Sequence, residues 1–119
     1  MVDSRGVQAL NQYEVWWADL PKPAGRRPVL LLSRPSAYSY LHKFIVAEIT
    51  TTIRGIPIEV AVGSREGLTK HSVVNCDNLR TIAKSTLVKK LGRLSPSRCA
   101  ELKRAVGYAL GWEELIGSA

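Results

Sequence analysis

Short runs of branched and aromatic residues recur along most of the chain, and each run ends at Pro, Gly, Asn or a charged residue. Runs of this length, evenly spaced and separated by turn-forming residues, are typical of strands in a small barrel or sandwich. The run VLLL is continuous rather than alternating, which predicts a strand that is buried on both faces. The predicted strands cover residues 13–20, 28–33, 44–52, 58–62, 72–75, 79–83 and 87–94.

The pattern changes period near the end of the chain. Ser95 and Pro96 form the expected start of a helix, with Ser95 as the N-cap and Pro96 at the first helical position. Gly111 is the expected stop. One apolar stripe lies between them at steps of three and four residues, formed by Cys99, Leu102, Val106, Ala109 and Leu110. The chain is therefore predicted to be mainly β with a C-terminal helix.

The length of 119 residues suits one domain, and 45% hydrophobic residues suffice for a core. We expect this domain to span residues 13–116. Residues 1–12 are mostly polar and are predicted to form a poorly ordered lead-in. They lack the apolar run of a signal peptide, and no segment approaches the roughly 18 apolar residues of a membrane span. These features predict a cytoplasmic protein without a membrane segment.

Charge adds the first information about a partner. Seventeen Lys and Arg residues against ten Asp and Glu residues leave a net charge of +7. The excess is concentrated: residues 22–43 hold five basic residues and residues 80–98 hold six, and neither stretch contains an acidic one. Such a surface attracts a polyanion, which leaves RNA, DNA or an acidic protein segment as candidates.

The usual catalytic arrangements are absent from the sequence. Cys76, Cys99, His42 and His71 do not stand at metal-ligand spacing, so we expect free thiols, no metal site and no cofactor. Glu48 and Glu59 are isolated carboxylates within predicted strands. Two features remain as candidate chemistry: the basic loop GRRP at residues 25–28, which enters a buried strand, and the threonine cluster at residues 50–52.

These two features lie within segments that resemble one family. The segment VWWADLPKPAGRRPVLLLSR (residues 15–34) is similar to the first hairpin of MazF/PemK-type endoribonuclease toxins, in which R-P-V follows a loop. FIVAEIT (44–50) is similar to their third strand, and SVVNCDNLRTIAKSTL (72–87) resembles their R-T-I-x-K segment. The resemblance implies an SH3-like small β-barrel and a homodimer, with an RNA groove along the subunit interface. It also implies an antitoxin partner with an acidic, disordered tail.

The resemblance also implies roles for individual residues. Arg27 and Thr50 correspond to the catalytic arginine and threonine, which cleave RNA without a metal to a 2′,3′-cyclic phosphate and a 5′-hydroxyl. RNA supplies the 2′-hydroxyl nucleophile itself, so the protein needs only fixed donors for the phosphate. Trp16 and Trp17 alternate faces, so one is expected in the core and Trp17 against RNA. The RNA-binding residues expected on this basis are Lys22, Arg26, Arg34, Thr51, Arg80 and Trp17.

The sequence departs from the family in the loop before Arg27. Only six residues, 21–26, separate Leu20 from Arg27, and the acidic residue that many relatives carry there is missing. Two alternatives remain open. One is a gyrase-directed toxin like CcdB, although the Trp-Gly-Ile ending of that family is not found in LIGSA at residues 115–119. The other is an SH3-like nucleic-acid-binding module without catalytic activity.

Overall fold

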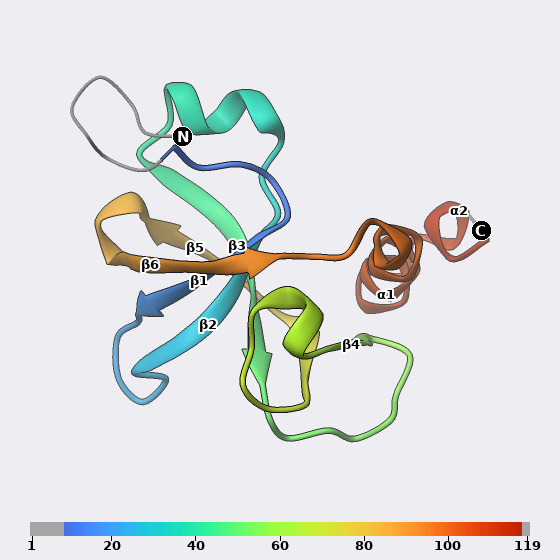
Figure 1. The fold of residues 1–119 in the computed structure, drawn as a ribbon. Coiled ribbons are helices and arrows are strands. Elements are labelled where there is room, and N and C mark those ends of the chain that lie inside the picture. The colour runs from blue at the N-terminus through green and yellow to red at the C-terminus, as the bar shows by residue number, and fades with distance from the viewer. Residues whose placement is uncertain (1–8, 118–119) are drawn as a thin grey trace.

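The computed structural model describes residues 9–117, which form one curved antiparallel sheet with a helix at its C-terminal end (Figure 1). The sheet order is β4-β5-β3-β2-β1-β6, so β4 and β6 lie at the edges of a half-barrel. The prediction of a mainly β fold with a C-terminal helix is confirmed. The strands are β1 (Glu14–Asp19), β2 (Arg26–Leu31), β3 (Lys43–Thr50), β4 (Glu59–Val62), β5 (Ser72–Ala83) and β6 (Leu87–Arg93).

Both faces of the sheet carry a hydrophobic core. On one face Val15 and Leu30 pack with Leu102 of α1 (Cys99–Leu110). On the other face Trp16 and Val29 pack with neighbouring apolar side chains, among them Leu10 from the chain before β1. Because β2 lies between the two cores, residues 29–31 are fully buried, as their continuous apolar run predicts. Most of the predicted lead-in, residues 1–8 of 1–12, lies outside the described residues.

Residues 72–83 form one strand, β5, so the prediction of two strands, 72–75 and 79–83, is wrong. The register of β5 with β3 jumps from Ala47↔Leu79 to Glu48↔Asn75, which leaves residues 76–78 as a bulge. The side-chain oxygen of Asn75 accepts a 2.9 Å hydrogen bond from the Asp77 amide within this bulge. The sequence predicted a break between two strands after Asn75, but the local hydrogen bond between Asn75 and Asp77 stabilises a bulge within one strand instead.

The helical end begins differently from the prediction. Ser95 precedes a 3-10 turn, η4 (Pro96–Arg98), and α1 begins only at Cys99. The Ser95 hydroxyl does not cap a helix, because it donates to the carboxylate of Glu66 in η2 (Ser64–Glu66). Gly111 ends α1 in the left-handed conformation, at φ 72°, as predicted. A short helix, α2 (Glu113–Ile116), follows.

The contact between Ser95 and Glu66 predicts a measurable stability effect. Burial raises the pKa of Glu66. Hydrogen bonds from Ser95 and the Gly63 amide, together with the charge of Arg98, lower it by more than burial raises it, so the pKa of Glu66 lies below its ordinary value of 4.5. Ser95→Ala removes one donor from this buried carboxylate and should cost about 1–3 kcal/mol of unfolding free energy at pH 7 in urea melts. The exposed Ser97→Ala is the matched control.

The pH dependence of this effect follows from the direction of the pKa. A carboxylate whose pKa is lowered by folding stabilises the fold above its ordinary pKa, and this contribution is lost as the pH falls through the folded value. The difference in unfolding free energy between the parent and Ser95→Ala should therefore become smaller below about pH 4.5. A gap that is equally wide at pH 3 and pH 7 would contradict the assignment to ionised Glu66.

Candidate active site

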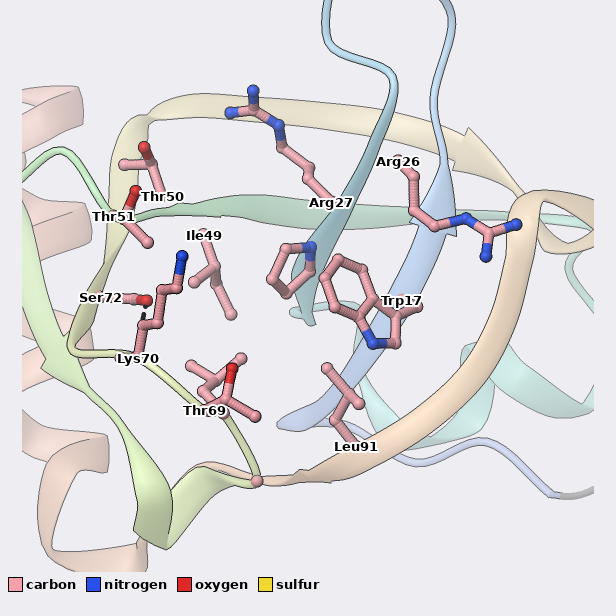
Figure 2. A pocket seen from close by; sticks show the side chains of 13 residues that line it. Trp17, Arg26, Arg27, Ile49, Thr50, Thr51, Thr69, Lys70, Ser72 and Leu91 are labelled. Carbon is pink, nitrogen blue, oxygen red and sulfur yellow. Dashed lines mark hydrogen bonds between the residues drawn. The ribbon is translucent and has the colours of Figure 1, made fainter.

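A pocket of about 390 Å³ lies where β2 begins and β3 ends (Figure 2). Its volume is in the range of small-ligand sites. Four segments that are distant in the sequence form it: the β1–β2 hairpin, the end of β3, the segment 67–72 and β6. The pocket is lined by Trp17, Arg26, Arg27, Pro28, Ile49, Thr50, Thr51, Gly67, Leu68, Thr69, Lys70, Ser72 and Leu91.

The pairing of β2 with β3 brings Arg27 and Thr50 together. Val29 pairs with Glu48 in this antiparallel ladder. Continuing the same register by two residues places Arg27 level with Thr50, and both line the pocket. The Thr50 hydroxyl oxygen accepts a 3.1 Å hydrogen bond from the Thr52 amide. This bond orients the hydroxyl and leaves its hydrogen available for a ligand.

Arg27 shares a carboxylate with Arg80. Arg27 Nη1 lies 3.2 Å from Glu48 Oε1, and Arg80 Nη1 lies 3.0 Å from Glu48 Oε2. Arg80 is thereby linked to the site although it does not line the pocket. The Nε of Arg27 is buried and has no hydrogen-bond partner among residues 9–117. Two positive charges therefore face one negative charge here, which leaves a net attraction for anions.

The two tryptophans divide as the strand alternation predicts. Trp16 is only 5% exposed, and its indole Nε1 donates a 3.0 Å hydrogen bond to Glu14 Oε1. Trp17 pairs with Pro28 across the ladder and lines the pocket. In Figure 2 the Arg27 side chain extends away from the Trp17 indole, because neighbouring positions on paired strands face opposite sides. The pocket thus has an aromatic wall and a separate cationic wall.

The other predicted residues are placed unequally. Thr51 and Arg26 line the pocket, but Arg26 also forms a two-point ion pair with Asp19, at 2.7 and 3.2 Å. The hydrogen bond from Arg26 lowers the pKa of the Asp19 carboxyl. Arg34 lies elsewhere, where it donates to the Tyr40 hydroxyl and stacks over that ring. Lys22 does not line the pocket either, so contacts of Arg34 and Lys22 with RNA remain predictions.

Two charged residues at the site were missed by the sequence reasoning, besides uncharged lining residues such as Thr69 and Ser72. Lys70 lines the pocket, and Figure 2 shows its ammonium group directed toward the side formed by Ile49 and Thr51. Glu48 was set aside as an isolated carboxylate, although it stands two positions before Thr50 on the strand that pairs with β2. That spacing was the available signal for Glu48. Lys70 had none, because only the folded chain brings it to β3.

A glycine contact holds the Lys70 segment in place. Gly67 has φ 88°, and a Cβ there would lie 2.0 Å from the carbonyl oxygen of Leu91. Gly92 meets the same segment from the other side, since its Cβ would lie 2.5 Å from the Glu66 carbonyl oxygen. Only two glycines allow the backbones of η2 and β6 to approach this closely. The segment 67–70 is therefore fixed beside β6, next to the pocket.

The donor set of this site suits a phosphate more than a metal. Guanidinium, ammonium and hydroxyl groups surround it, and Arg can hold phosphate oxygens with two parallel hydrogen bonds. Within residues 9–117, no group of three or more His, Cys, Asp or Glu side chains is arranged to hold a metal ion. The described part of the chain also contains no helix long and apolar enough to span a membrane.

The fold and the pocket together define a class: a β half-barrel with a C-terminal helix and a pocket lined by arginine, lysine and threonine. Residues 11–110 match the model of the PemK-like, MazF-like toxins of type II toxin–antitoxin systems. The chain belongs to this family, which confirms the resemblance noted in the sequence.

Individual relatives agree with this assignment. A protein of Mycobacterium tuberculosis named probable endoribonuclease MazF5 is 41% identical over 99 residues, which are 82% of this chain and 89% of that protein. The solved toxin MazF-mt6 of Mycobacterium tuberculosis superposes with a TM-score of 0.77 at 39% identity, covering 82% of this chain and 96% of its own. A mycobacterial endoribonuclease solved with its cognate antitoxin gives a TM-score of 0.78 at 31% identity, covering 87% and 97%.

Proposed function

We propose that this chain is an endoribonuclease toxin of a type II toxin–antitoxin pair, and that it cleaves RNA with Arg27 and Thr50. The observation that carries the proposal is the joint position of these two side chains in one pocket, next to Arg80 and Lys70. The endoribonuclease names of the relatives support RNA as the substrate. They favour RNA cleavage over gyrase inhibition or simple nucleic-acid binding.

The proposed reaction uses the nucleophile that RNA carries. The 2′-oxygen gives its proton to water and bonds to the adjacent phosphorus, while the bond from phosphorus to the 5′-oxygen breaks and that oxygen takes a proton from water. Negative charge builds on the phosphate oxygens in between. Arg27 donates to these oxygens, and the Thr50 hydroxyl donates to one of them. The products are a 2′,3′-cyclic phosphate and a 5′-hydroxyl, and no metal takes part in the scheme.

The test is direct. Purified protein is incubated with total RNA in EDTA, and new 5′-hydroxyl ends are mapped. Cleavage at discrete sites that persists in EDTA supports the proposal. Intact RNA, or cleavage only with added Mg²⁺, contradicts it.

The aromatic wall of the pocket supports a base-binding role for Trp17. An unpaired base can stack on an aromatic ring for about 1–3 kcal/mol. We therefore expect Trp17→Ala to raise KM for an RNA oligonucleotide about tenfold or more, with a smaller change in kcat, as measured by initial rates. Trp112, exposed near the end of α1 and away from the pocket, supplies the control Trp112→Ala. An unchanged KM for Trp17→Ala would remove Trp17 from the RNA-binding site.

Two partners belong to the proposal besides RNA. The first is a second copy of this chain, because exposed apolar side chains such as Ile53 and Ile56 offer surface for a subunit contact. Light scattering at micromolar concentration tests this dimer. The second is an antitoxin whose acidic segment competes with RNA for the basic residues, a proposal supported by the similar endoribonuclease solved with its cognate antitoxin.

A further inference from the structure

Glu48 occupies the centre of a charged row that crosses three neighbouring strands. It lies on β3, between Arg27 on β2 and Arg80 on β5. Each carboxylate oxygen accepts one guanidinium: Oε1 from Arg27 at 3.2 Å and Oε2 from Arg80 at 3.0 Å.

The strand registers explain this row. Glu48 pairs with Val29, so Arg27 is its diagonal neighbour on β2. Arg80 pairs with Val46, two residues before Glu48, so it is the diagonal neighbour on β5. All three side chains therefore leave the sheet on the same face. The bulge at residues 76–78 of β5 shifts the pairing with β3 between Ala47 and Glu48. This shift fixes how far along the sheet Arg80 lies from Arg27.

Burial separates Glu48 from an ordinary surface ion pair. Its side chain is 12% exposed, whereas Arg27 and Arg80 are 32% and 33% exposed. The carboxylate is thus covered, while both guanidiniums still reach solvent. Salt and water screen such a covered charge weakly, so it holds its partners more firmly than an exposed carboxylate would.

We propose that Glu48 is a positioning residue of the RNA cleavage site. It holds Arg27 against the phosphate to be cleaved and Arg80 beside it, where Arg80 binds a neighbouring phosphate of the same strand. This inference rests on the proposed function. Under this proposal Glu48 orients Arg27, and Arg80 binds a second phosphate. Neither the loop before Arg27 nor the threonine cluster supplies these two functions.

The physical reason is the repulsion between the two guanidiniums. Without a carboxylate between them, two positive charges on alternate strands move apart, and Arg27 loses its fixed direction. Glu48 takes one Nη1–H from each arginine and leaves further Nη–H donors of both for phosphate oxygens. The short hairpin loop offers no substitute, because the Asp19 carboxylate before it is engaged by Arg26.

The prediction separates rate from affinity. In Glu48→Gln the local charge becomes more positive, so RNA should bind as tightly as before or more tightly. The misdirected Arg27 should nevertheless lower kcat about 10- to 100-fold, since a shift of about 1 Å at a catalytic group has an effect of this size. Loss of a merely structural residue would lower kcat and RNA affinity together.

The experiment measures single-turnover cleavage at saturating RNA, and Kd for an RNA with a 2′-deoxy sugar at the cleavage position. The variants are Glu48→Gln, Arg80→Gln and the double variant, with Glu114→Gln on α2 as the control for lost charge. Folding is checked by circular dichroism. A slower Glu48→Gln with equal or tighter Kd supports the proposal. An unchanged or faster rate overturns it, because Glu48 then only competes with phosphate. Rate and affinity falling by the same factor also overturn it.

The double variant keeps the test valid if Glu48→Gln alone fails to fold. Arg80→Gln removes the repulsion, so Glu48→Gln should cost less rate in that background than in the parent, and a folded double variant should cleave no slower than Arg80→Gln by more than a few fold. Additive effects, or a further large loss in the double variant, would overturn the proposal.

Arg27→Ala distinguishes failure of the proposed function from failure of the role of Glu48. If it cleaves like the parent, the proposed function fails as well. If it is inactive and Glu48→Gln is fully active, only the role of Glu48 fails.

Discussion

Arg27→Ala is expected to slow RNA cleavage about 100- to 1000-fold, as removal of one fixed donor to a developing charge does in other enzymes. Arg27 stands at the start of β2, directly before Pro28, whose fixed φ stiffens the backbone there. Its guanidinium is further held by Glu48. Arg80 still neutralises Glu48 in the variant, so the thermal midpoint should change little. Single-turnover cleavage of a labelled oligonucleotide, with a growth assay in cells, measures the effect.

The neighbouring arginine provides a matched control. Arg26 carries the same charge on the same strand, but its guanidinium is engaged by Asp19 and is largely exposed. Arg26→Ala should weaken RNA binding modestly and retain most of the rate. If Arg26→Ala abolishes cleavage while Arg27→Ala does not, the catalytic assignment is off by one residue.

The second large effect is expected at Thr50. Thr50→Val keeps the branched shape and removes the hydroxyl, so it should slow cleavage by about 100-fold or more. Thr50→Ser keeps the hydroxyl and should retain most of the activity. The reason is the hydrogen bonding of the hydroxyl: its oxygen accepts the Thr52 amide, so its own hydrogen is not used in that bond and can be donated to a phosphate oxygen. Single-turnover rates of the two variants give the comparison.

Two further variants delimit the result. Thr52→Ala removes an exposed side chain whose backbone amide, and not its hydroxyl, contacts Thr50. It should therefore leave the rate close to that of the parent. Equal rates for Thr50→Val and Thr50→Ser would show that the hydroxyl has no part in the reaction, and the catalytic role of Thr50 would be withdrawn.

The local pattern of the sequence determined most of the elements. The continuous apolar run predicted that β2 is buried on both faces, and the alternation around Trp16 and Trp17 predicted that the two rings would take opposite faces. Gly111 predicted the end of α1, because few other residues adopt its left-handed backbone readily. The motifs around Arg27 and Thr50 also predicted the family. Each of these signals lies within a few neighbouring residues, where backbone preference and side-chain period operate.

Only the tertiary structure decided the rest, since it depends on groups that are distant in the chain. Glu48 meets Arg27 across 21 residues and Arg80 across 32. The same holds for the Ser95 hydroxyl. It donates to Glu66, 29 residues away, instead of capping the helix as expected. Asn75 and Asp77 could form either a turn or a bulge, and pairing with β3 selected the bulge. A sequence specifies which side chains carry charge, but strand register determines which charges meet, and in this protein that register assembles the candidate site.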